Sequence, residues 1–404
     1  MVSKESSSQP TNLALTPRPA WLLPLVLVLL VRGLSAGGAG IQPHTSEHDC
    51  APHPRSPLAV NVRDLGFGAR GDGQGDDTAA IQRAVDTVVG TGGTVFIPTG
   101  IYRVNALTSI RLGSDMTLSL AQGAILKAIS NGAPHSSILK VVGVERVNIL
   151  GGTLVGDRAE HAGQEGEWGH GLTISNAQKV IVEGVTAKEC WGDGFYISSS
   201  SEVTFCRVVA DHNRRQGMSI TSGKGLVVRN STFRNTAGTL PEDGLDIEPN
   251  PGDTVDDVLI TGCRFMNNAG FGIEVGVAAS HTDRAWITRV VLDGNTCEGN
   301  GAHSLSTSPR AGIEVANCVG LRISNNRVAR NGLGILLRGG ANGCAVTGNT
   351  ISTNNGDGIV QYLCTGNTIK DNRIVGNKGL GIQSSKSTEN GISGNTLSGN
   401  RPVR

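Results

Sequence analysis

Apolar and polar positions in the C-terminal half of the chain repeat with a fixed period. Asn349, Asn372 and Asn395 lie in near-identical contexts (VTGNTI, IKDNRI and ISGNTL), each 23 residues after the one before. Short β-branched runs separated by Gly and Asn at this period indicate a solenoid in which each turn is one unit. We predict an all-β fold, a single-stranded parallel β-helix with coils of about 23 residues. Equivalent residues of successive coils would then lie about 4.8 Å apart.

The segment 59–104 has a different pattern, which predicts strands on either side of a helix. Residues 60–62 alternate as a strand does, and Asp72 is expected to serve a turn. Asp76 and Asp77 are expected to provide N-cap groups for the helix. The apolar face expected for this helix consists of Ile81, Ala84, Val85 and Val88.

The stretch FGARGDGQGDDTAAIQRA in this segment resembles the N-terminal cap of the pectate-lyase-like superfamily of right-handed parallel β-helices. The similarity is close over the cap and extends to the rest of the chain through its repeat pattern. It implies a right-handed parallel β-helix with an N-terminal capping helix. The superfamily includes lyases, hydrolases, epimerases and phage tailspikes, so the resemblance implies the fold rather than one reaction.

Composition agrees with a solenoid and excludes some partners. Aromatic residues make up 3% of the chain, and there are 57 Gly in 404 residues. A narrow bore filled by Val, Ile, Leu and small residues suits these values. The formal net charge of +1 provides no basic field for nucleic acid. The sequence does not specify an oligomeric state.

The N-terminal region predicts export. Residues 21–31 (WLLPLVLVLLV) form an apolar run that is too short to span a bilayer. Basic residues precede it and small residues follow, which predicts a signal peptide at 1–39, with an uncleaved anchor as the alternative. A Pro-, His- and Ser-rich linker is expected at 40–56, and the β-helix domain at 57–404. We expect a secreted or periplasmic protein without stable membrane association after signal cleavage.

The eight cysteines do not resemble a disulfide framework. Aligning the coils puts Cys206 and Cys263 at the turn position of the repeated Asn, where they would be buried. Cys344 could approach Cys318 or Cys364 on neighbouring coils. Export would permit a disulfide, and its pairing stays open.

The middle coils carry charged residues where the others do not. We aligned the coils on the Gly that precedes each apolar-x-apolar strand, so that the residue between the two apolar positions points outward. Three successive coils then present Asp246, Glu274 and Glu314, and Glu248 shares the face of Asp246. Like charges at this spacing repel, so a proton, a cation or a base must neutralise them. The complete outward column is Thr173, Tyr196, Ser219, Asp246, Glu274, Glu314, Leu336 and Val360.

A second polar column lies just before the aligned Gly and includes His170, Asp193, Gln216 and Asp243. Polygalacturonase-type hydrolases carry their acids at this junction, and the GHG and DG sequences around His170 and Asp193 are similar to theirs. Their paired Asp motif and their Arg-x-Lys motif are absent here. The resemblance therefore implies a distant relative.

Residues expected to bind substrate surround these columns. Either Arg214 or Arg215 could bind a substrate carboxylate or hold Asp243 ionised. Exposed tryptophans beside carboxylates suit stacking on sugar rings. Inserts at 276–285 and 301–309 also indicate a binding face. The substrate-binding residues predicted are His170, Tyr196, Arg214, Arg215, Gln216, Glu314, Trp168, Trp191 and Trp286.

We favour a hydrolase that degrades a polysaccharide and needs neither metal nor cofactor. Asp246 and Glu248 are two residues apart on one strand face, which would place their carboxyl groups roughly 6–8 Å apart, as inverting glycosidases require. Asp193 or Asp243 could replace either partner, and Glu274 belongs to the same catalytic group.

Two other functions stay open. In a polysaccharide lyase or uronate epimerase, Arg215 or His170 would act as the base, while Asp243, Asp246 and Glu274 bound Ca²⁺. The Asp-Pro-His motif of the epimerases is absent. The third candidate is a non-catalytic glycan-binding solenoid. It would have a groove lined by aromatic and amide side chains, without clustered carboxylates.

Overall fold

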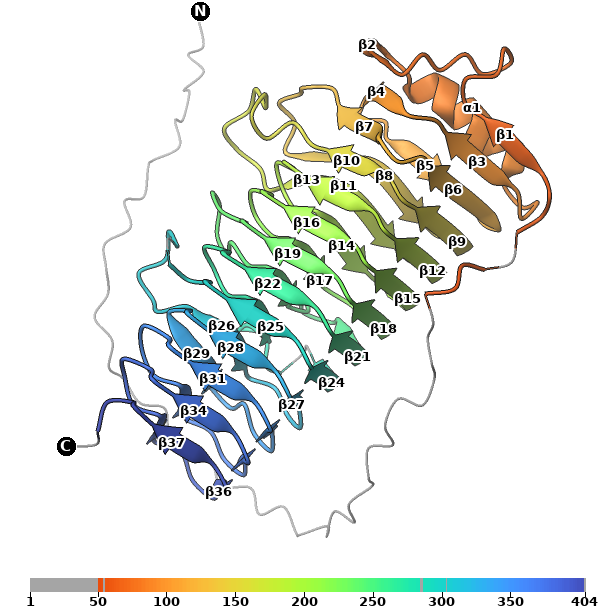
Figure 1. Ribbon diagram of the computed structural model, residues 1–404. Helices are drawn as coiled ribbons and strands as arrows, with labels where there is room; N and C mark the ends of the chain where they lie inside the picture. The colour runs from red at the N-terminus through yellow and green to blue at the C-terminus, as the bar shows by residue number, and fades with distance from the viewer. Residues whose placement is uncertain (1–49, 54, 284–285, 303, 403–404) are drawn as a thin grey trace, which may run out of the picture. The chain divides into compact units, whose positions relative to one another are not determined.

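Strands of successive coils lie one under another along the whole molecule (Figure 1). The computed structural model describes residues 50–53, 55–283, 286–302 and 304–402, all within one compact unit. Each coil contributes one strand to each of three sheets, and neighbouring strands pair in parallel. The protein is a right-handed parallel β-helix, which confirms the fold predicted from the repeat. The expected signal peptide at 1–39 lies outside the described residues.

We number the three sheets by their first strands. Sheet 1 contains β1 (Ala59–Asn61), β3 (Thr94–Ile97), β6 (Met116–Leu120), β9 (Glu145–Leu150), β12 (Gln178–Glu183), β15 (Ser200–Cys206), β18 (Gly223–Arg229), β21 (Thr254–Thr261), β24 (Trp286–Asp293), β27 (Arg322–Ser324), β30 (Ala345–Thr347), β33 (Thr368–Lys370) and β36 (Gly391–Ser393). Sheet 2 contains β2 (Asp72–Asp76), β4 (Gly100–Val104), β7 (Ala124–Ala128), β10 (Thr153–Val155), β13 (Thr186–Lys188), β16 (Val209–Asp211), β19 (Thr232–Arg234), β22 (Arg264–Met266), β25 (Thr296–Glu298), β28 (Arg327–Ala329), β31 (Thr350–Ser352), β34 (Arg373–Val375) and β37 (Thr396–Ser398).

Sheet 3 is the sheet whose outward face carries the predicted carboxylates. It contains β5 (Ile110–Leu112), β8 (His135–Val142), β11 (Trp168–Ser175), β14 (Phe195–Ser198), β17 (Met218–Ile220), β20 (Leu245–Ile247), β23 (Ile273–Gly276), β26 (Ala311–Ala316), β29 (Leu333–Arg338), β32 (Ile359–Tyr362) and β35 (Ile382–Ser385). The loops that lead from sheet 2 into sheet 3 vary most in length. They form one border of this face.

Helix α1 (Thr78–Val88) packs at the N-terminal end of the solenoid (Figure 1). Its predicted apolar face is buried, as expected. Asp72 accepts the backbone N–H of Gln74, which confirms its turn role. Asp76 accepts the N–H of Thr78 at 2.8 Å. Asp77 occupies the N-cap position but accepts the N–H groups of residues 70 and 71 instead, so the expectation that it caps the helix was wrong.

Asparagine ladders hold the turns of the C-terminal coils. Asn349 donates its side-chain N–H to the side-chain oxygen of Asn372 at 2.9 Å and to the backbone oxygen of Ile323. Its own side-chain oxygen accepts the backbone N–H of Asn326 at 2.8 Å. These amides are buried, and each coil satisfies the next one. The repeat predicted this ladder. A second ladder, at the turn before sheet 3, was missed and consists of Asn268, Asn300, Asn331, Asn354, Asn377 and Asn400.

The structure corrects the alignment of one cysteine and assigns one disulfide. Val208, rather than Cys206, occupies the ladder position one coil before Ser231. The sequence alignment was two residues out of register there. Cys206 ends β15 and is bonded to Cys50, with Cα atoms 5.9 Å apart. Cys263 does occupy the ladder position, where its N–H donates to Asn295.

The other cysteines of the described chain are free and buried. Cys344 lies in the column of Asn367, so it is not paired with a cysteine of the neighbouring coils. Within the expected linker, His53 is attached to the solenoid by hydrogen bonds to Asn148 and to the backbone of Lys179. No helix in the described ranges has the length and apolarity needed to cross a membrane.

Candidate active site

The outward column of sheet 3 has the register that the sequence alignment predicted. Ser219 on β17 pairs with Asp246 on β20, which pairs with Glu274 on β23, which pairs with Glu314 on β26. The apolar residues on either side of each of them point into the bore and are buried. Strand alternation therefore fixes these polar side chains on one face.

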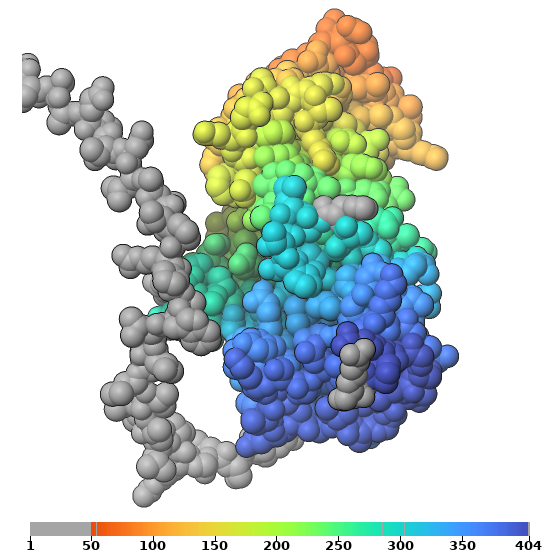
Figure 2. Space-filling view, turned by 90° about the vertical axis from the view of Figure 1, so that its left-hand side faces the viewer, coloured from red at the N-terminus to blue at the C-terminus, as the bar shows by residue number. Residues whose placement is uncertain are grey.

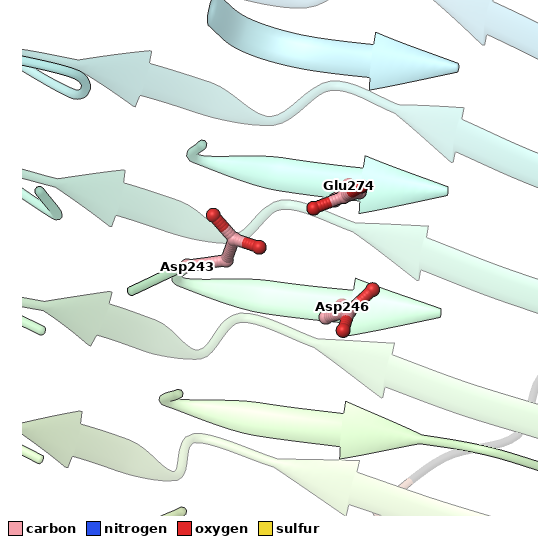
Figure 3. A group of neighbouring side chains, drawn as sticks. All are labelled: Asp243, Asp246 and Glu274. Atoms are coloured by element: carbon pink, nitrogen blue, oxygen red, sulfur yellow. The ribbon is translucent and has the colours of Figure 1, made fainter. Parts of the chain in front are cut away.

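Asp243, Asp246 and Glu274 form a compact group, which we call the acid cluster (Figure 3). A carboxylate oxygen from each lies within 4.8 Å of the other two. Asp243 precedes β20, and its Oδ1 accepts the N–H of Phe271 at 2.5 Å. Gly270 leaves room for this carboxylate, because an added Cβ would lie 2.1 Å from that oxygen. The glycine is thus required by a close approach.

Burial raises the pKa of all three acid-cluster carboxyls well above the usual range. Asp246 is 3% exposed, and the nearby charges of Glu274 and Glu248 raise its pKa further. The nearby charges of Asp243 and Glu314 likewise raise the pKa of Glu274. Three such groups cannot all ionise in this space, so the cluster keeps protons at neutral pH or binds a cation. Asp246 Oδ1 is buried without a hydrogen-bond partner among the described atoms.

A hydrogen-bond network links the acid cluster to Asp193. Gln216 donates its side-chain N–H to Asp246 Oδ2 at 2.6 Å. The hydroxyl of Ser219 contacts Gln216 and lies 2.8 Å from Asp193 Oδ2. Arg215 pairs with Asp193 at 3.4 Å and with Glu167 at 3.0 Å. The arginine therefore compensates the charge of Asp193, which is fully buried.

His170 lies beside Asp193 as a neutral imidazole. Its Nδ1 accepts the backbone N–H of Asp193 at 3.2 Å, which places the ring proton on Nε2. Burial lowers the pKa of His170 to about 4, although the Asp193 charge acts in the opposite direction. The ring stacks on Tyr196 with centroids 4.9 Å apart.

Glu314 continues the column beyond the acid cluster but has its own counter-ion. It is fully buried, and Arg338 contacts its Oε1. Burial raises the pKa of Glu314, and Arg338 acts against that rise. Its Oε2 is buried without a hydrogen-bond partner in the described chain. Glu248, in contrast, is an exposed residue directly after β20.

The two predicted arginines have different surroundings. Arg215 reaches Asp193, as described above. Arg214 places its guanidinium 3.7 Å from the ring centre of Trp191 and donates to the backbone oxygens of Gly166 and Trp191. His161 stacks on the same ring at 4.1 Å. The structure thus puts Arg214 and Trp191 in a packed stack that holds the loop before β11.

The remaining tryptophans are exposed but lie on different sheets. Trp168 opens β11 of sheet 3 and stacks on His135, with centroids 4.6 Å apart. Trp286 opens β24 of sheet 1. Trp286 therefore belongs to a different sheet from the one that carries the predicted carboxylates.

Sequence reasoning missed two residues close to the acid cluster, Glu242 and Arg310. Glu242 directly precedes Asp243, is 1% exposed and accepts hydrogen bonds from two loops. Arg310 lies at the end of an insert, and its guanidinium is 4.6 Å from the ring centre of Phe271. The long insert at 301–309 was the signal in the sequence that pointed to this region. It could not identify the partners of Glu242 and Arg310, because these depend on the conformation of the loops.

Two family profiles match the chain. A profile described as the right-handed beta helix region matches residues 142–248 and 252–403. A profile described as rhamnogalacturonase A/epimerase, pectate lyase-like, matches residues 59–133. Together they cover the solenoid coils and the N-terminal cap.

Several named proteins are similar to this chain in sequence. The uncharacterized protein YclG of Bacillus subtilis is 27% identical over 73% of this chain and 59% of its own length. The exo-poly-alpha-D-galacturonosidase of Dickeya chrysanthemi is 39% identical over 21% of this chain and 13% of its own length. Mannuronan C5-epimerase AlgE2 of Azotobacter vinelandii is 27% identical over 55% and 26%, respectively. The chain therefore spans less than two thirds of each of these relatives.

Two solved structures show the same fold. The hyperthermoactive exopolygalacturonase of Thermotoga maritima superposes with a TM-score of 0.65 and 14% identity, over 86% of this chain and 94% of that one. PfbA, a surface adhesin of Streptococcus pneumoniae, has a TM-score of 0.64 and 18% identity, over 85% and 93%. The fold thus occurs in both an enzyme and an adhesin.

Proposed function

The chain belongs to the right-handed β-helix family, with a pectate-lyase-like cap, and we propose that it is a glycoside hydrolase acting on a polysaccharide at sheet 3. The observation that carries this proposal is the acid cluster, in which carboxylate oxygens of the buried Asp243 and Asp246 and the half-buried Glu274 lie within 4.8 Å of one another. Burial and mutual repulsion keep a proton there at neutral pH. A retained carboxylic proton is what the general acid of a glycosidase needs.

We assign Asp246 as the general acid and Glu248 as the general base. Asp246 would donate its proton to the glycosidic oxygen as the bond to the sugar carbon breaks. Glu248 is exposed to water and would remove a proton from the water that attacks that carbon. Glu248 directly follows the strand that carries Asp246, and the separation of roughly 6–8 Å expected from the sequence would suit inversion. Gln216 holds Asp246 in place, while burial and the nearby charges of Glu274 and Glu248 raise the pKa of Asp246.

The comparisons support a carbohydrate substrate without fixing the reaction. Named relatives include a galacturonosidase and mannuronan epimerases, each matched over only part of its length. The proposal therefore specifies a polysaccharide but no particular sugar unit. His170, Tyr196 and the exposed Trp168 would contact a sugar unit on β11 and β14, the coils that precede the cluster.

A Ca²⁺-dependent lyase or epimerase is the second candidate, and one observation favours it. The three acid-cluster oxygens are suitably placed for a divalent cation, and Asp246 Oδ1 has no hydrogen-bond partner within the residues that the structure describes. Asp243, Asp246 and Glu274 would hold the ion, which would neutralise a uronate carboxylate.

The bases expected for that reaction are unfavourable here. His170 Nδ1 already accepts a hydrogen bond from the Asp193 backbone. Burial acts to lower the pKa of Arg215, but Asp193, Asp246 and Glu167 outweigh it and raise this pKa overall. A more strongly held proton makes Arg215 a poor base, so hydrolysis is the better supported reaction.

The test is incubation of the protein with polygalacturonate, mannuronan and a neutral glucan, with and without chelator. Hydrolysis predicts new reducing ends, no ultraviolet band of an unsaturated uronate and no effect of chelator. The appearance of that band, lost with chelator, would replace the hydrolase by a lyase. Binding without any new product would assign a non-catalytic glycan-binding solenoid. Proton exchange into the polymer without cleavage would indicate an epimerase.

We also propose that the protein is exported to a secreted or periplasmic location. Disulfides persist in oxidising compartments, and Cys50 is bonded to Cys206. Alkylation of the protein in its native compartment, followed by peptide mass analysis, tests this. Free Cys50 and Cys206 thiols in that sample would contradict export.

A further inference from the structure

Glu242 connects two loops that border the acid cluster. Its Oε1 accepts the N–H of Gly238 at 2.9 Å. Its Oε2 accepts the N–H of Leu305 at 2.8 Å and the hydroxyl of Ser304 at 3.0 Å. The residue is 1% exposed, and three donors satisfy the buried carboxylate. Glu242 also has a φ of 71°, which is uncommon for a non-glycine residue and marks a constrained position.

The same contacts lead from Glu242 to Arg310. Arg310 Nε donates to the hydroxyl oxygen of Ser304 at 3.4 Å, and its guanidinium lies over Phe271. Phe271 is buried, and its backbone N–H binds Asp243 of the acid cluster. Figure 2 shows the cyan part of the chain, which includes the 304–310 segment, projecting from this side of the molecule. Glu242 and Ser304 thus hold the positively charged side chain of Arg310 beside the acid cluster.

Arg310 occupies the same place in its coil as Arg215. Both directly precede the polar column, at the junction between loop and strand. β17 and β26 are three strand spacings apart, which corresponds to about 14 Å, and the acid cluster lies between them. Arg215 is paired with Glu167 and Asp193. Arg310 has no carboxylate within ion-pair distance in the described part of the chain, although its charge acts to lower the pKa of Asp243 and of Glu314. Within the same residues its guanidinium donates one hydrogen bond, from Nε to Ser304, and its other N–H groups can bind a ligand.

We propose that Arg310 binds the substrate and that Glu242 is the positioning residue that sets Arg310 in place through Ser304. This inference rests on the proposed function. The planar guanidinium fork suits two neighbouring oxygen atoms, either a carboxylate or two hydroxyls of one sugar unit. That sugar unit would lie over β23 and β26, on the opposite side of the cluster from Arg215. The substrate would therefore extend along the helix axis across Asp246.

A double-mutant cycle on the full chain tests the proposal, with E242Q, R310A and the double variant compared on the substrate that the wild type cleaves. We expect R310A to raise KM by roughly tenfold to a hundredfold, with kcat within about threefold. E242Q should raise KM in the same direction, and the double variant should match R310A alone, because Glu242 acts through Arg310. R310K should restore part of the loss. The control is R327A, which removes an exposed arginine on β28 of sheet 2.

Additive effects of E242Q and R310A, or an unchanged KM in R310A, would overturn the inference. Parallel assays on a uronate polymer and its carboxyl-reduced form identify the oxygen atoms bound. A loss confined to the uronate polymer assigns a carboxylate, and an equal loss on both assigns hydroxyls.

A measurement without substrate separates this inference from the proposed function. Amide hydrogen exchange of the 304–310 segment should become faster in E242Q and stay unchanged in R327A. Unchanged exchange in E242Q would refute the positioning role, whatever the enzyme does. If the wild type binds polygalacturonate but cleaves nothing, the hydrolase assignment fails, and the same cycle on the dissociation constant decides the role of Arg310.

Discussion

The last coils and the middle coils use the same backbone but fill equivalent positions with different chemistry. In the last coils, buried polar residues are amides such as Asn349 and Asn372, and each donates to the next coil and accepts from the previous one. In the middle coils, the buried polar residues at sheet 3 include the carboxyls of Asp243 and Asp246, which repel one another. Amide ladders stabilise a stack, whereas stacked carboxyls do not.

This difference indicates where stability and function reside. Nothing in the packing of the bore requires an acid cluster, because the inward residues of these coils are as apolar as those of the others. The cluster is held by specific partners, including Gln216, Phe271 and Gly270. Perturbed carboxyls with dedicated partners are typical of functional sites. The two regions should therefore respond in opposite ways to substitution.

The largest expected effect is the loss of activity on replacing the general acid. Asp246→Asn keeps the size and most contacts of the side chain but removes the proton that the leaving oxygen needs. We expect kcat to fall by about a thousandfold while the folded state is retained. Reducing-end assays with circular dichroism melts of both proteins measure this. Retained activity in a folded variant would remove Asp246 from the site.

The second effect is a loss of stability without loss of activity, in the last coils. Asn349→Ala removes the oxygen that accepts both the buried backbone N–H and the side-chain N–H of Asn326. We expect a decrease of about 3 kcal/mol in the free energy of unfolding, since two or more buried groups become unsatisfied. Asn355→Ala, at an exposed position six residues later in the same coil, is the matched control. Urea melts followed by specific activity would test the comparison, and an inactive folded N349A would contradict it.

The comparison also explains how much the sequence could predict. The repeat predicted the register of the eight strands of sheet 3 from β11 to β32, because period-two alternation leaves one way to bury the apolar residues. It therefore placed Asp246, Glu274 and Glu314 in one column correctly. It misplaced Cys206 by two residues. Two successive coils there have Val208 and Ser231 at the ladder position, where later coils have Asn.

Contacts made by loops were beyond the repeat pattern. Glu242 reaches Ser304 across 62 residues of sequence, and Arg310 reaches Phe271 through the same insert. The disulfide between Cys50 and Cys206 joins a segment that precedes the first strand to β15. Such partners depend on how each loop folds back, and no spacing in the sequence encodes that.

The third effect concerns the attachment of the N-terminal segment. Cys206→Ser should lower the free energy of unfolding by about 2 kcal/mol, because the disulfide restricts the unfolded chain over 156 residues. Activity of the folded variant should be unchanged, since Cys206 lies on sheet 1. Cys50→Ser and reductant treatment of the wild type should each reproduce the loss. Destabilisation by reductant in C206S as well would point to another cause.

The smallest effect is a pH dependence of stability that originates in the acid cluster. The folded-state pKa of Asp246 is raised above its unfolded value of about 4. Its contribution to stability is therefore complete below about pH 4 and is lost as pH rises through the raised pKa. Exposed carboxyls with lowered pKa, such as Asp72 and Asp115, are already ionised in this window and contribute no slope there.

Asp246→Asn should flatten this slope, because the amide cannot ionise. We expect its Tm to exceed that of the wild type by about 2 °C at pH 8 and to equal it at pH 4. Asn355→Ala should keep the wild-type slope, since it lies in the amide-rich coils. Equal slopes in the wild type and D246N would mean that Asp246 does not gain charge in this range. If added Ca²⁺ flattens the wild-type slope and leaves D246N unchanged, a cation replaces the proton, and the second candidate function becomes the better one.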